Sequence, residues 1–104
     1  FSVALRYNPE KDGAPILLAK GHDHMALKIR EIAKAHGIEQ VAAPPLARAI
    51  YHHAEVGQEI PNGLYLAVAQ VLAYVFQLKQ FRRRVSPRPK MPDFPIPDDL
   101  KSNP

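Results

Sequence analysis

The stretch that decides the fold runs from residue 16 to residue 42 and reads ILLAKGHDHMALKIREIAKAHGIEQVA. It opens with a short apolar run, ILLA, which is typical of a buried strand. Apolar residues then recur at helical spacing, and the expected inward face consists of Met25, Ile29 and Ile32. A second apolar run at residues 38–42 predicts another strand. Strand, helix and strand in this order predict a βαβ unit with parallel strands and a right-handed crossover.

Capping residues set the expected limits of the helices. Asp23 predicts the N-cap of the first helix, and Gly37 predicts its end. A Pro-Pro pair then opens a second helix over residues 46–55. Asn62 predicts the N-cap of the longest helix, residues 64–81, which is apolar nearly all round. Such a helix lies at the centre of a domain or exposes an apolar face that can bind a partner.

The first seven residues, FSVALRY, alternate as a half-buried strand does. One expected face consists of Phe1, Val3, Leu5 and Tyr7. An edge strand at a chain end is poorly held by itself, so we expect an upstream segment, absent here or on another chain, to pair with it.

Composition limits the class of protein. The 104 residues, 46% of them hydrophobic, suffice for one core. The chain has no cysteine, which excludes disulfides and thiolate metal sites. A net charge of +4 is a mild excess that leaves a nucleic-acid-binding domain open as an alternative function. The most apolar stretch, residues 64–78, is shorter than the roughly 20 residues that cross a bilayer.

Composition changes from residue 86 onward. Residues 86–104 contain six prolines, which exclude a central strand and predict an extended, mobile tail without a helix. We therefore expect a folded domain at residues 1–85 and a proline-rich flexible tail at residues 86–104.

Three stretches together are more specific than any short motif: VALRYNPEKDGAPILLAKGHDHMALKIREIAKAHGI at residues 3–38, PPLARAIY at 44–51 and EIPNGLYLAVAQVLAYV at 59–75. They resemble the cytoplasmic domain of the FlhB/YscU/SpaS family, and especially its flagellar members. The resemblance implies an integral membrane export component that cleaves itself in an Asn-Pro-Thr-His loop, after which the two halves stay associated. That motif is missing here, and its histidine would directly precede the position of Phe1. We therefore assign no catalytic residue and expect no enzyme.

The resemblance completes the expected fold and function. The fold would be an α/β domain with a small mixed sheet flanked by helices, with three strands from this chain and one from the upstream cleavage fragment. The domain, on the cytoplasmic side of an inner-membrane protein, would dock exported subunits of the rod and hook types and switch to filament types after cleavage. Its partners would be the upstream fragment, these subunits, a hook-length ruler protein and other export-gate components, with no cofactor and no nucleic acid.

The resemblance also implies a substrate-docking patch at positions that match Ala14, Pro15, Ala69 and Leu72. The residues alone leave other interpretations open. Ala14 and Pro15 also fit an ordinary turn, and Ala69 and Leu72 also fit core packing.

Two polar clusters remain. The histidine pairs His22/His24 and His52/His53 lack the three- or four-residue spacing of helical zinc ligands, so we expect no metal site. The run Arg82, Arg83 and Arg84 follows the longest helix, where cations stabilise the carbonyl end of the helix dipole. It would also suit a membrane-proximal cluster on anionic lipid or, less well, a nucleic-acid contact.

Overall fold

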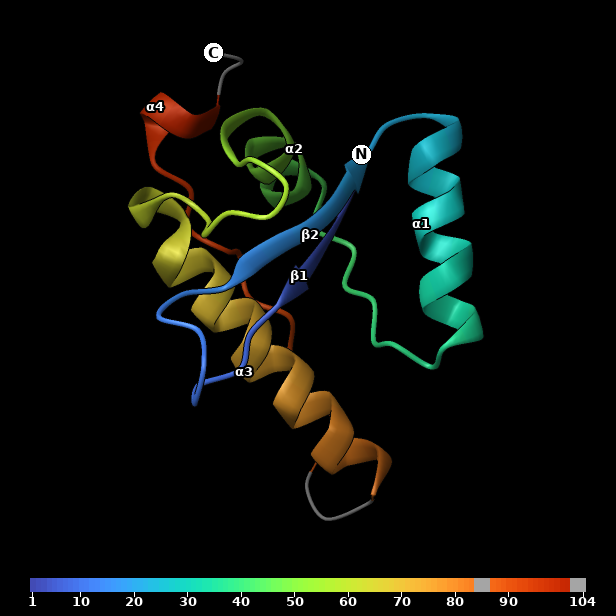
Figure 1. Cartoon of the computed structure of the whole chain (residues 1–104). Coiled ribbons are helices and arrows are strands. Elements are labelled where there is room, and N and C mark those ends of the chain that lie inside the picture. Colours follow the sequence, from blue (N-terminus) through green and yellow to red (C-terminus); the bar gives the residue numbers. More distant parts are fainter. Residues whose placement is uncertain (84–86, 102–104) are drawn as a thin grey trace.

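The computed structural model describes residues 1–83 and 87–101. Its elements, in chain order, are β1 (Ser2–Arg6), β2 (Ile16–Gly21), α1 (His24–Ala35), α2 (Pro44–His53), the 3-10 turn η1 (Asn62–Leu64), α3 (Tyr65–Arg82) and α4 (Asp98–Lys101). Helix α1 covers one face of the β1–β2 sheet, and α2 and α3 lie on the other (Figure 1). The α/β fold class is therefore confirmed.

The two strands form an antiparallel sheet whose register runs from Ser2 opposite Gly21 to Arg6 opposite Ile16. The predicted first strand is confirmed, but its alternation holds only in part: Val3 and Leu5 pack against the core, whereas Phe1 and Tyr7 are exposed. The register shifts between Ala4 and Leu5, which leaves Leu18 of β2 as the extra residue of a bulge. Within the described residues the sheet is antiparallel rather than mixed.

The prediction of a third strand at residues 38–42 is wrong, and so is the parallel βαβ unit built on it. The outer edge of β2 is occupied by the segment 57–60 instead. Leu17 donates its N–H to the carbonyl oxygen of Gln58 at 3.0 Å and accepts from the N–H of Gly57 at 2.7 Å. A strand from residues 38–42 could not pair with β2 at this edge, because these backbone groups are already bonded.

The main core lies between the sheet, α2 and α3. Its largest fully buried side chains are Leu17, Ile50, Ile60, Leu64 and Val68. Leu17 comes from β2 and Ile50 from α2, while Leu64 is the last residue of η1 and Val68 lies in the first turn of α3. Burial of each such side chain stabilises the fold by about 1.5–3 kcal/mol.

A lysine links the sheet to α2. The Lys20 Nζ atom donates hydrogen bonds to the carbonyl oxygens of Tyr51 at 3.0 Å and Ala54 at 2.9 Å, and it lies 5.2 Å from the centre of the Tyr51 ring. The last carbonyls of a helix have no partners within it. The ammonium group therefore satisfies these carbonyl oxygens at the end of α2, and its positive charge interacts favourably with the helix dipole.

Helix α1 ends as predicted but packs differently. Gly37 adopts a left-handed φ of 67°, and the N–H of Ile38 bonds back to the carbonyl oxygen of Ala33 at 2.9 Å, which is a Schellman motif. The predicted inward face is wrong in part, because Met25 is 59% exposed and Ile32 is 48% exposed. The only residue of α1 that is buried is Ala26, since a small side chain lets the helix lie close to the sheet.

The first residues of the three longer helices are close to those predicted. Asp23 precedes α1, but its side chain makes no capping bond, and its carboxylate instead lies 2.9 Å from Nδ1 of His22. Helix α2 begins with the Pro-Pro pair, as expected. Asn62 begins η1 rather than capping α3 directly.

The proline-rich segment is attached to the core rather than free. Phe94, Ile96 and Leu100 are partly buried against it, and a Cβ built on Gly63 would lie 2.7 Å from a methyl carbon of Leu100. Residues 98–101 form the short helix α4, which lies against α2. These contacts differ from the helix-free, mobile tail that the prolines predict, because apolar side chains between them bind the core. The proposed boundary after residue 85 falls outside the described residues.

Candidate functional site

Helix α3 exposes an apolar stripe along one side. Leu66 and Phe76 are each 62% exposed, and Ala69 and Ala73 lie exposed between them at helical spacing. Tyr65 and Leu72 flank this row and are also exposed. We call these six residues the α3 stripe. On the opposite side of the helix, Ala67 and Val68 pack into the core, and Leu78 is also buried.

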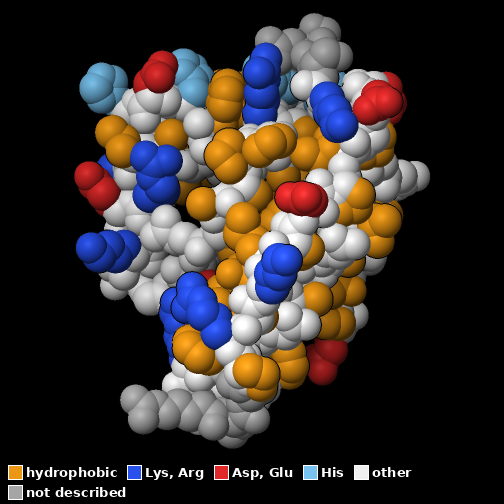
Figure 2. All heavy atoms as spheres, turned by 180° about the vertical axis from the view of Figure 1, so that it is seen from behind, with side chains coloured by type: hydrophobic (Ala, Val, Ile, Leu, Met, Phe, Trp, Pro, Cys, Tyr) orange, Lys and Arg blue, Asp and Glu red, His pale blue; other side chains and the backbone are white. Residues whose placement is uncertain are grey.

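The α3 stripe contains two of the four residues predicted for docking. The interpretation of Ala69 and Leu72 as ordinary core residues is not supported, since both are exposed. Composition explains the exposure, because a helix that is apolar all round cannot bury every side against a core of this size. Hydrophobic side chains gather on the part of the rear surface formed by α3 and the proline-rich segment (Figure 2).

Sequence reasoning did not single out Leu66 and Phe76. Residues 64–81 are apolar on all sides, which signals that some apolar side chains of the helix must be exposed. This pattern does not show which side of the helix faces solvent. Asn62–Arg82 is 21 residues long and, by length and composition alone, apolar enough to cross a membrane. Core helices of soluble proteins pass the same test, and α3 has one side in a core.

The other two predicted residues lie in the loop that joins β1 to β2. Ala14 is buried at 3% exposure, and Pro15 is half-buried. The carbonyl oxygen of Pro15 accepts a hydrogen bond from the N–H of Ile60 at 3.0 Å, which fixes the entry into β2. Ala14 therefore supports the loop from inside and offers little surface to a ligand.

A carboxylate closes this loop. Oδ1 of Asp12 lies 3.1 Å from an Arg6 guanidinium nitrogen, and Oδ2 accepts a hydrogen bond from the N–H of Asn8 at 2.9 Å. The bond from Arg6, followed by the bond from Asn8, lowers the pKa of Asp12 below its ordinary value. The carboxylate stays ionised at neutral pH, where the pair is intact.

Of the arginine run at the end of α3, the structure describes Arg82 and Arg83. Arg82 pairs with Glu39 at 2.6 Å and so ties α3 to the connection between α1 and α2. Arg83 is exposed, and Arg84 lies outside the described residues. Arg88 lies over the ring of Phe81, 5.5 Å from its centre. This arrangement divides the positive charge and does not favour the nucleic-acid alternative.

Two of the histidines belong to an aromatic cluster at the start of β1. The Phe1 ring lies 4.8 Å from that of Tyr51 and 5.3 Å from that of His52, and His22 adjoins Tyr51 at 5.7 Å. Desolvation, and then the charge of Arg48, lowers the pKa of His52, so the neutral ring is favoured. Over residues 1–83 and 87–101, no group of three His, Asp or Glu side chains is placed to hold a metal ion.

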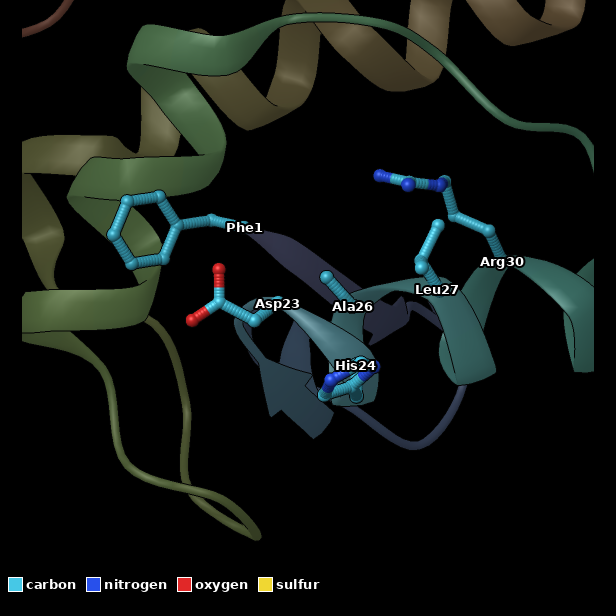
Figure 3. A pocket seen from close by; sticks show the side chains of 6 residues that line it. All are labelled: Phe1, Asp23, His24, Ala26, Leu27 and Arg30. Atoms are coloured by element: carbon cyan, nitrogen blue, oxygen red, sulfur yellow. The ribbon is translucent and has the colours of Figure 1, made fainter.

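An open hollow of about 610 Å³ lies between the start of β1 and the first turns of α1. Phe1 and Asp23 line one side, Leu27 and Arg30 the other, with His24 and Ala26 between them (Figure 3). The hollow offers apolar and charged walls but no nucleophile paired with a base.

A sequence model of the FlhB, HrpN, YscU and SpaS family matches residues 1–75. The chain belongs to this family. Among curated members, FlhB of Salmonella typhimurium, named a flagellar biosynthetic protein, is 52% identical over 101 residues. That alignment covers 96% of the chain and 26% of the relative. FlhB of Bacillus subtilis is 48% identical over 80 residues, covering 77% of the chain and 22% of the relative. The chain thus spans about a quarter of the length of these FlhB proteins.

Solved structures agree with the family assignment. The cytoplasmic domain of FlhB from Shewanella putrefaciens has a TM-score of 0.91 and 53% identity, covering 96% of the chain and 79% of the relative. The C-terminal domain of PscU has a TM-score of 0.69 and 35% identity, covering 71% of the chain and 94% of that domain. The chain therefore has the fold of the family's cytoplasmic domain.

Proposed function

We propose that this chain is part of the cytoplasmic domain of an inner-membrane component of the flagellar type III export apparatus, and that it binds exported subunits without catalysing a reaction. The observation that carries the proposal is the α3 stripe on a domain of the FlhB family. Contiguous exposed apolar surface on a folded domain marks a site of interaction.

The α3 stripe suits a short apolar segment of a rod- or hook-type subunit. Ala69 is small and lies between the larger Leu66 and Phe76, which leaves a shallow gap for one apolar side chain of the incoming segment. Leu72 adds apolar contact beside it. Pro15 would contribute the edge of the site, and the buried Ala14 would act only by shaping the loop.

The proposal assigns the change of specificity to the coupling of two pieces. In the described residues, the edge of β1 opposite β2 carries no strand, and an upstream cleavage fragment would pair there. Cleavage alters one covalent bond, so its effect is a looser coupling of the fragments, and a shift toward a state that accepts filament-type subunits follows. A hook-length ruler protein and other export-gate components would bias this shift.

The test is Ala69→Asp in the full-length protein. A charge in the stripe should reduce export of hook-type subunits at least tenfold, because an ionised carboxylate opposes burial of an apolar segment. Stability should change by no more than about 1 kcal/mol, as is usual for exposed positions. Export is measured in cells, and folding is measured by thermal melting of the purified chain.

Ala35→Asp is the matched control, since Ala35 is an exposed alanine on α1, on the other face of the sheet. It should export normally. If Ala69→Asp melts like the parent and exports hook-type subunits normally, the stripe is not the docking surface. Phe76→Ser, at a residue that is 62% exposed, provides a second test should Ala69→Asp lower the melting temperature.

A further inference from the structure

The loop between β1 and β2 is held closed by side chains as well as by its backbone. Asp12 accepts bonds from Nε and a terminal nitrogen of Arg6 at 3.3 and 3.1 Å and from the N–H of Asn8 at 2.9 Å. The side chain of Asn8 accepts from the N–H of Glu10 at 3.0 Å. The backbone carbonyl oxygen of Asn8 accepts hydrogen bonds from the N–H groups of Lys11 and Asp12 at 3.0 and 2.7 Å.

Asp12 is the central residue of this network. The Asp12 side chain is only 7% exposed, and a carboxylate withdrawn from water requires charged or N–H partners. The planar fork of Arg6 meets both of its oxygens, a geometry that a single ammonium group cannot reproduce. Arg6 lies at the end of β1, so the pair ties the loop to the sheet.

The same loop leads directly into the expected docking residues. Ala14 follows Asp12 by two positions and is buried, and Pro15 is anchored by Ile60. The loop is thus fixed at one end by the Arg6–Asp12 pair and at the other by the bond to Ile60. Pro15 lies next to this second anchor.

We propose that Arg6 and Asp12 are positioning residues for docking: their ion pair preforms the loop so that Pro15 is presented in one conformation to an apolar segment of an exported subunit. The inference rests on the proposed function. A loop that samples several conformations binds more weakly, because apparent affinity falls with the fraction of molecules that are competent to bind.

The experiment compares Arg6→Met, which keeps the length of the side chain but removes the fork, with Arg6→Lys, which keeps the charge. Lys11→Met is the matched control, since Lys11 is an exposed cation of the same loop. Amide hydrogen exchange and melting are measured on the purified chain, and export of hook-type subunits is measured in cells that carry the full-length variants. Asp12→Asn, which is isosteric, repeats the test from the other side of the pair.

Arg6→Met should raise exchange at Asn8 and residues 10–12 at least tenfold, raise exchange of core amides only by the smaller factor that the loss of global stability requires, and reduce hook-type export several-fold. Arg6→Lys should be intermediate, and Lys11→Met should match the parent. A purely structural role would instead raise exchange of the loop amides and the core amides by the same factor. If Arg6→Met lowers the melting temperature more than Asp12→Asn does, Asp12→Asn decides the matter by the same two readouts.

Two results overturn the proposal. Unchanged exchange in the loop would mean that the pair does not hold it, and raised exchange with normal export would mean that loop order is not used in docking. Ala69→Asp separates this failure from failure of the proposed function. If that variant loses hook-type export while Arg6→Met does not, docking stands and positioning is refuted; if both export normally, both are refuted.

Discussion

Replacing Lys20 by methionine isolates the link between β2 and α2. Methionine keeps an apolar stem of similar length, but it cannot donate to the carbonyl oxygens of Tyr51 and Ala54, which Nζ reaches at 3.0 and 2.9 Å. A hydrogen bond to a charged group contributes about 1.5–3 kcal/mol. The half-buried site admits some water to the freed carbonyls, so we expect a total loss of about 2–3 kcal/mol, to which the cation–π contact with Tyr51 contributes.

Thermal melting and urea unfolding of the purified chain measure this loss. For a domain of this size each kcal/mol corresponds to roughly 4–8 °C, so Lys20→Met should lower the melting temperature by about 8–24 °C. Lys28→Met is the control, because Lys28 is exposed on α1 and lysine and methionine have similar helix propensities. A Lys20→Met variant that melts within about 2 °C of the control would refute the argument that this ammonium group holds α2 to the sheet.

Two further predictions concern the proline-rich segment and the loop. Leu100→Ala should lower the free energy of unfolding by about 1 kcal/mol, because it removes half-buried apolar contacts beside Gly63. Urea unfolding should show no such loss for Met91→Ala, a change at an exposed residue. Equal stability of the two variants would indicate that the proline-rich segment is detached from the core. Asp12→Asn should lose stability relative to the parent at neutral pH, and the difference should shrink in acid. The folded-state pKa of Asp12 lies below its ordinary value of 3.8, so its contribution is complete above that value and is lost as pH falls through the lowered pKa. A difference that stays constant between pH 7 and pH 2 would contradict this assignment.

Local patterns predicted the helices well and the sheet only in part. Gly37 and the Pro-Pro pair act on their immediate neighbours, so the limits of α1 and α2 could be predicted from them. The failed third strand depended on a competition between distant segments. Residues 38–42 are apolar enough for a strand, but the segment 57–60 takes the edge of β2, and no local signal ranks two such competitors.

The candidate site, too, could be predicted from the sequence only in part. Resemblance to the family singled out Ala69 and Leu72, and neither helix periodicity nor composition could have done so, because α3 is apolar on all sides. Periodicity also failed on α1, where Met25 and Ile32 share an apolar spacing with Ile29 but lie exposed. The sheet is too narrow to cover that face. A narrow sheet is a property of the whole fold and is not encoded in the helix itself.

The weak seating of α1 has a consequence for motion. This helix of twelve residues contributes one buried side chain, Ala26, whereas α2 contributes three. Local opening free energies follow the buried contacts of each unit, and they range from near zero to that of global unfolding. Helix α1 would therefore detach from the sheet and return many times for each complete unfolding of α2 and α3. Each excursion would bare the face of the sheet that carries Ser2, while the core on the opposite face stays intact.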